Sequence, residues 1–126
     1  MSEEKTNETD EALAVKLPAY RLDGRVALVT GASAGLGAAI AIGMAQAGAE
    51  VAIMARSREG LERVAARIRA DGGLCTPIAC DVTDPAGVEA AFDAVMRRFG
   101  RIDTLFNNAG ISRPAGLIDE IPLADW

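Results

Sequence analysis

Three glycines stand where an apolar run gives way to a helical pattern, and their spacing is typical of a dinucleotide-binding turn. Gly31, Gly35 and Gly37 follow the run 26–30 and precede an alanine-rich stretch. Glycine lets a backbone turn tightly and approach a pyrophosphate, and the free N–H groups that open a helix attract the anion. A glycine cluster can also be a plain tight turn, but its place in a βαβ unit of about 30 residues favours a nucleotide.

The glycine pattern is not that of a P-loop. A P-loop needs Lys and then Ser or Thr after its last glycine, whereas this chain continues with Ala38 and Ala39. The motif therefore predicts a dinucleotide bound through backbone N–H groups.

The residue types that usually transfer protons are scarce. The chain has no His, its one Tyr is Tyr20, and its two lysines are Lys5 and Lys16, all before the first predicted strand. Only carboxylates and two cysteines remain as candidates. We therefore expect a cofactor-binding portion that is catalytically inactive by itself.

Short apolar runs alternate with helical-period segments from Arg25 onward, which predicts a parallel sheet built from βαβ crossovers. Strands are expected at 26–30, 50–55, 74–79 and 102–107, and helices at 35–47, around 61–68 and from 85 to a stop at Gly100. The apolar face of the first helix is expected to contain Leu36, Ile40, Met44 and Ala47. Right-handed crossovers give a doubly wound α/β sheet of the Rossmann type, incomplete, with strand order 3-2-1-4.

Length and charge indicate one globular domain with an acidic start. Among 126 residues with a net charge of −5, the first 12 carry five acids and one lysine, or −4. We expect a disordered tail over 1–21 and a dinucleotide-binding domain over 22–126. With no signal-peptide pattern, no apolar stretch of about 20 residues and no basic stripe, the sequence predicts a cytoplasmic protein without membrane or nucleic-acid partners.

The two cysteines, Cys75 and Cys80, are five positions apart and would point to opposite faces of an extended strand. This is not a metal-binding or redox spacing. Both are expected to be buried core residues.

Three motifs in order resemble those of the short-chain dehydrogenase/reductases: TGASAGLG at 30–37, Asp81-Val82 after the third strand, and NNAG at 107–110. The resemblance covers about residues 22–126. It implies that the glycine loop cradles the pyrophosphate and ribose through Gly31, Ser33, Ala34, Gly35, Leu36 and Gly37. It also implies that Asp81 accepts a hydrogen bond from the adenine amino group and that Val82 offers its N–H. Asn108, Ala109 and Gly110 would line the adenosine side, and Asn107 would brace the sheet.

Two of these motifs also have a plainer interpretation. Asp81 lies in Asp-Val-Thr-Asp-Pro, which is good turn and capping chemistry before a helix. NNAG can be an ordinary strand exit. The position of Asp81 at the carboxyl end of a strand favours ligand binding.

The choice of cofactor depends on the residues after the second strand. An acidic residue there would bind the ribose hydroxyls of NAD, but the chain has Arg56, Ser57 and Arg58. A guanidinium pairs bidentately with a 2′-phosphate, so Arg56, helped by Ser57 and Arg58, favours NADP over NAD. The alternative is that Arg56 and Arg58 are solvated charges at a helix start, a poor place for cations.

The resembled family carries its chemistry in a Ser and a Tyr-x-x-x-Lys pair well beyond NNAG, and this chain has no counterpart to them. The resemblance implies hydride transfer between NADP(H) and an alcohol or ketone, and dimers or tetramers, for a full-length protein. The alternatives are a non-catalytic nucleotide-binding or interaction module and an incomplete gene product.

Overall fold

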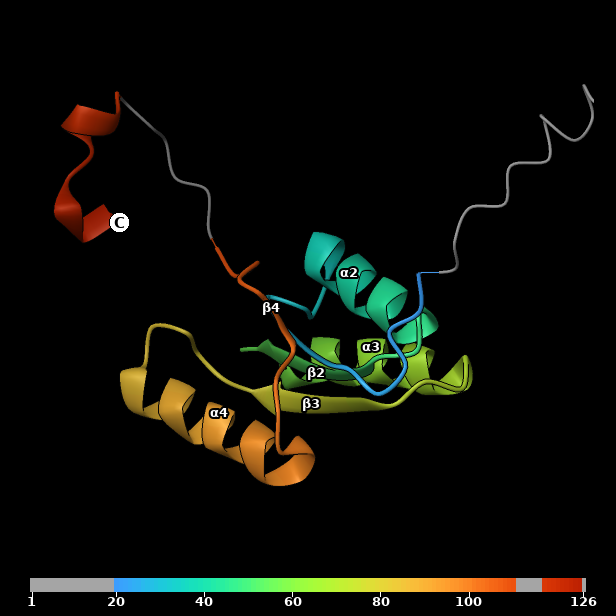
Figure 1. Ribbon diagram of the computed structural model, residues 1–126. Helices are drawn as coiled ribbons and strands as arrows, with labels where there is room; N and C mark the ends of the chain where they lie inside the picture. Colours follow the sequence, from blue (N-terminus) through green and yellow to red (C-terminus); the bar gives the residue numbers. More distant parts are fainter. Residues whose placement is uncertain (1–19, 111–116, 126) are drawn as a thin grey trace, which may run out of the picture.

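The computed structural model describes residues 20–110 and 117–125 (Figure 1). In this part of the chain four parallel strands form one sheet in the order β3-β2-β1-β4. The strands are β1 (Val26–Thr30), β2 (Glu50–Ala55), β3 (Cys75–Ala79) and β4 (Thr104–Phe106). The helices are α2 (Gly35–Gln46), α3 (Arg58–Ala70) and α4 (Pro85–Phe99), and the 3-10 helices η1 (Ile118–Glu120) and η2 (Leu123–Asp125) follow. The predicted fold class and strand order are confirmed.

The sheet separates two apolar cores, because successive strand residues face opposite ways. Val29 and Ile53 belong to the core under α2 and α3, whereas Leu28 and Met54 belong to the core under α4. Figure 1 shows α4 on the far side of the sheet from α2 and α3. The helices thus cover both faces and leave the carboxyl ends of the strands open.

The cysteines are buried on opposite faces of the sheet, as predicted. Cys75 packs in the core under α2 and α3, and Cys80 in the core under α4. Burial raises the pKa of the Cys75 thiol to about 11, and burial also raises the pKa of Cys80. Neither thiol is therefore poised as a nucleophile.

The predicted apolar face of α2 is wrong at its first residue. Leu36 is 70% exposed, and the helix instead turns the buried residues Gly37 and Ala41 toward the sheet. Since α2 is apolar on nearly every side, periodicity does not distinguish its faces, and the smallest side chains allow the closest approach.

Two strands are shorter than predicted. β4 begins at Thr104. Asp103 before it donates its N–H to the Val26 carbonyl oxygen at 2.9 Å, but Val26 N donates to the side-chain Oδ2 of Asp103 at 2.8 Å and not to a backbone carbonyl oxygen. β3 begins at Cys75, and Leu74 before it is exposed.

The predicted tail falls almost entirely outside the described residues. Of its last two residues, Tyr20 is exposed and Arg21 donates from Nη1 to the carbonyl oxygen of Gln46 at the end of α2. No helix in the described ranges is both long and apolar enough to cross a bilayer.

Candidate functional site

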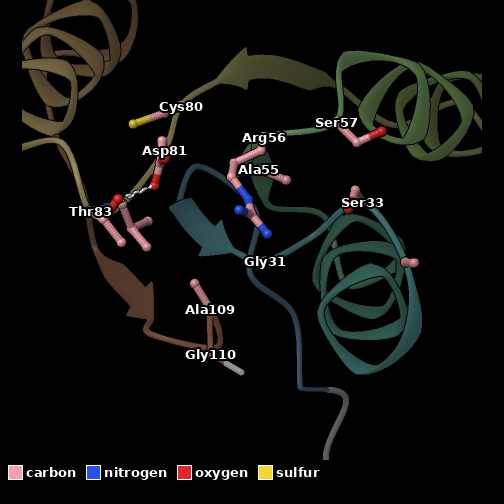
Figure 2. Close-up of a pocket in the computed structure, with 12 residues that line it drawn as sticks. Gly31, Ser33, Ala55, Arg56, Ser57, Cys80, Asp81, Thr83, Ala109 and Gly110 are labelled. Atoms are coloured by element: carbon pink, nitrogen blue, oxygen red, sulfur yellow. Dashed lines mark hydrogen bonds between the residues drawn. The ribbon is translucent and has the colours of Figure 1, made fainter. Parts of the chain in front are cut away.

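A cavity of about 780 Å³ opens at the carboxyl end of the sheet (Figure 2). Each of the four strands delivers residues to it, and this is where open α/β sheets bind their ligands. The lining consists of Gly31, Ser33, Ala34, Ala55, Arg56, Ser57, Cys80, Asp81, Val82, Thr83, Ala109 and Gly110.

The turn after β1 needs its glycines for different reasons. Gly31 and Gly35 have φ values of 63° and 57°, in the left-handed region that side chains disfavour. Gly37 is required by space instead, because an added Cβ would collide with the carbonyl oxygen of Gly31 and lie 2.6 Å from Asn108 Nδ2. The first turn of α2 therefore lies directly against the end of β1.

The two helices that cover this face of the sheet, α2 and α3, begin differently. In α3 the Ser57 hydroxyl caps the helix by accepting from Gly60 N at 3.1 Å, and Glu59 adds an acid to the first turn. In α2 the N-cap is Ala34, and among the described residues no side chain caps the helix and no acid lies in its first turn. The N–H groups that open α2 are therefore available to an anion.

Thr30 holds the glycine turn to the segment after β4. Its hydroxyl oxygen accepts from Asn108 N at 3.1 Å and Ala109 N at 3.0 Å, and it donates to the Phe106 carbonyl oxygen at 3.3 Å. Sequence reasoning did not select Thr30 as a site residue, although it is the one polar residue of an apolar strand.

Asn107 is expected to brace the sheet, but the side chain that bonds to the turn after β1 is that of Asn108. Asn108 Nδ2 donates to the Gly31 carbonyl oxygen at 3.3 Å, whereas Asn107 is exposed. β4 ends at Phe106, so both asparagines lie beyond the strand, and the turn there directs the second one toward β1.

Arg56 follows β2 and lines the cavity together with Gly31 and Asp81 (Figure 2). Its charge acts on Asp81 and contributes to lowering the pKa of that carboxyl. Arg58 is the first residue of α3 and is not among the lining residues. The two arginines thus differ in position, and only Arg56 lines the cavity.

Asp81 makes the turn that its sequence predicts and also lies at the cavity. Its Oδ1 accepts from Thr83 Oγ1 at 2.7 Å and Thr83 N at 2.9 Å, which makes a turn before α4. These hydrogen bonds are the main reason that the pKa of Asp81 lies below its ordinary value. At the same time Asp81 lines the cavity.

Not every predicted site residue reaches the cavity. Gly35, Leu36, Gly37 and Asn108 are not among the lining side chains and support the glycine turn or open α2 instead. Ala55, Cys80 and Thr83 line the cavity but were not predicted. Within the described ranges no three potential metal ligands lie together.

Comparison with known proteins agrees with this architecture. The family profile described as short chain dehydrogenase matches residues 25–126. The chain is 51% identical over 107 residues to a D-threitol dehydrogenase of Mycolicibacterium smegmatis, a match that covers 85% of this chain and 41% of that protein. It is 47% identical over 93 residues to the versicolorin reductase stcU of Emericella nidulans, covering 73% of this chain and 35% of that protein.

Solved structures give the same result. A metagenomic short-chain oxidoreductase in complex with NADP matches with a TM-score of 0.74 and 41% identity, over 83% of this chain and 48% of that one. Hydroxysteroid dehydrogenase from Escherichia coli matches with a TM-score of 0.76 and 36% identity, over 85% of this chain and 45% of that one. The chain thus spans less than half the length of these relatives. It belongs to the short-chain dehydrogenase/reductase family of oxidoreductases.

Proposed function

We propose that this chain is the cofactor-binding portion of an oxidoreductase that prefers NADP(H) and exchanges hydride with an alcohol or ketone. The observation that carries the preference is Arg56, which lines the cavity directly after β2. A carboxylate at that point would repel a 2′-phosphate, whereas a guanidinium pairs with it. The relative whose structure contains NADP supports the same choice.

The remaining lining residues fit the rest of the cofactor. The uncapped start of α2 suits the pyrophosphate, and Asp81 with Val82 suits the adenine. Ser57 keeps its hydroxyl proton for a phosphate oxygen, because in the cap it acts only as acceptor. When bound, the nicotinamide would supply or accept the hydride.

The 126 residues are proposed to bind the cofactor without transferring hydride. They contain no His, and Tyr20, the one tyrosine, precedes β1. A hydride acceptor of the carbonyl type needs a proton donor near its oxygen. We propose that in a full-length protein this donor lies outside the chain described here, and that the whole protein is cytoplasmic and oligomeric.

Titration of the purified chain with NADPH and NADH, followed by nicotinamide fluorescence, tests the proposal. NADPH is expected to bind more tightly, and Arg56→Ala is expected to weaken NADPH by about 10- to 100-fold while changing NADH by less than about threefold. Arg58→Ala is the matched control, since it removes the same charge outside the cavity. An unchanged NADPH affinity in Arg56→Ala contradicts the proposed cofactor preference.

A further inference from the structure

We propose that Thr83 is a positioning residue that makes the cavity select an adenine base over a base with a carbonyl oxygen at C6, such as hypoxanthine. It does so by holding the Asp81 carboxylate in one orientation. The inference rests on the proposed function, since it takes the cavity to hold the adenosine part of a nucleotide.

The geometry separates the two oxygens of Asp81. Both donors of Thr83, its hydroxyl at 2.7 Å and its N–H at 2.9 Å, converge on Oδ1. Oδ2 accepts no hydrogen bond from any residue in the described ranges 20–110 and 117–125. Figure 2 shows the paired side chains at the wall of the cavity. Thr83 therefore uses one oxygen and leaves the other to a ligand.

The free oxygen is a pure acceptor. Hydrogen bonds from Thr83 and the charge of Arg56 both favour ionised Asp81, and an ionised carboxylate has no proton to donate. It can accept from the exocyclic amino group of adenine, but it repels the carbonyl oxygen that hypoxanthine carries at the same place. The discrimination is sharp only while the carboxylate stays in place, because a rotating carboxylate can turn away from the carbonyl oxygen.

A purely structural role for Thr83 makes a different prediction. The turn also contains the hydrogen bond from Asp84 N to the Asp81 carbonyl oxygen at 3.0 Å. If the Thr83 hydroxyl only stabilised this turn, its removal would lower stability and weaken both bases equally. The preference between bases is therefore the informative quantity.

The experiment measures binding of adenosine 2′,5′-bisphosphate and inosine 2′,5′-bisphosphate by calorimetry. These probes contain only the base, ribose and phosphates that this cavity would hold. The variants are Thr83→Val, which removes the hydroxyl and keeps the N–H, and Thr83→Ser, which keeps both donors. Thr76→Val is the control. It also removes a hydrogen-bonded hydroxyl, since Thr76 Oγ1 accepts from Arg98 Nε at 3.0 Å, but Thr76 does not line the cavity.

The unmodified chain is expected to prefer the adenosine probe, and Thr83→Val is expected to reduce that preference about three- to tenfold. Thr83→Ser and Thr76→Val are expected to keep the preference of the unmodified chain. If the unmodified chain binds neither probe, the proposed function falls and this inference falls with it. If it prefers adenine and Thr83→Val leaves the ratio unchanged, only the positioning role of Thr83 is refuted.

Discussion

Gly37→Ala tests whether the close contact between α2 and β1 is required. Alanine in a helix interior ordinarily adds about 0.5–1 kcal/mol of stability relative to glycine. At Gly37 the added Cβ would collide with the Gly31 carbonyl oxygen, which is backbone and cannot rotate away. Overpacking of this kind costs about 1–3 kcal/mol, and contact with backbone places it near the upper end. We expect a net loss of about 2 kcal/mol in the free energy of unfolding.

Gly43→Ala is the matched control, because Gly43 lies in the same helix and an added Cβ there meets nothing within 4 Å besides its chain neighbours and the helix's own backbone. It should stabilise the protein by about 0.5–1 kcal/mol, so the two variants should differ by about 3 kcal/mol. Urea unfolding followed by far-ultraviolet circular dichroism measures both. Equal stability of the two variants would refute the argument that Gly37 is required by space.

Two further predictions concern the ends of β1. Thr30→Val leaves the N–H groups of Asn108 and Ala109 without their acceptor and should lower the free energy of unfolding by about 2–3 kcal/mol. Thr30→Ser keeps the hydroxyl and should retain most of that stability in urea unfolding. Equal losses in the two variants would contradict the role of the hydroxyl. The Arg101 guanidinium and Val26 N–H hold the pKa of Asp103 at about 2, below its ordinary value, so the unfolded chain takes up this proton first as pH falls. The contribution of ionised Asp103 to the free energy of unfolding is present above about pH 4 and is lost toward about pH 2. Asp103→Asn should therefore flatten this part of the pH profile of stability measured by urea unfolding. An unchanged acid profile in Asp103→Asn would count against this role.

The sequence predicted the sheet well because its strands are continuous apolar runs separated by helices with clear stops. Gly100, for example, ends α4 in the left-handed conformation that glycine favours, with φ 73°. The exposure of Leu36 was missed because α2 is apolar on nearly every side. The first residue of β4 was missed because Asp103 bonds to β1 through its side chain.

The cavity was predicted in outline, since glycine and acidic residues at strand ends are visible in the sequence. The supporting contacts were not visible. Thr30 bonds to residues 76 to 79 positions away, and only the folded chain brings them together. Thr83 is near Asp81 in sequence, but the sequence does not tell which carboxylate oxygen its two donors reach.

NMR of the isotope-labelled chain during titration with NADPH tests most directly whether this cavity holds the cofactor, because it follows each backbone amide separately. We expect saturable shifts at the amides of the glycine turn, at Arg56 and around Asp81, with little change at the opposite end of the sheet near Gly73 and Asp103. Shifts confined to that opposite end, or no saturable shifts in a folded sample, would contradict the account.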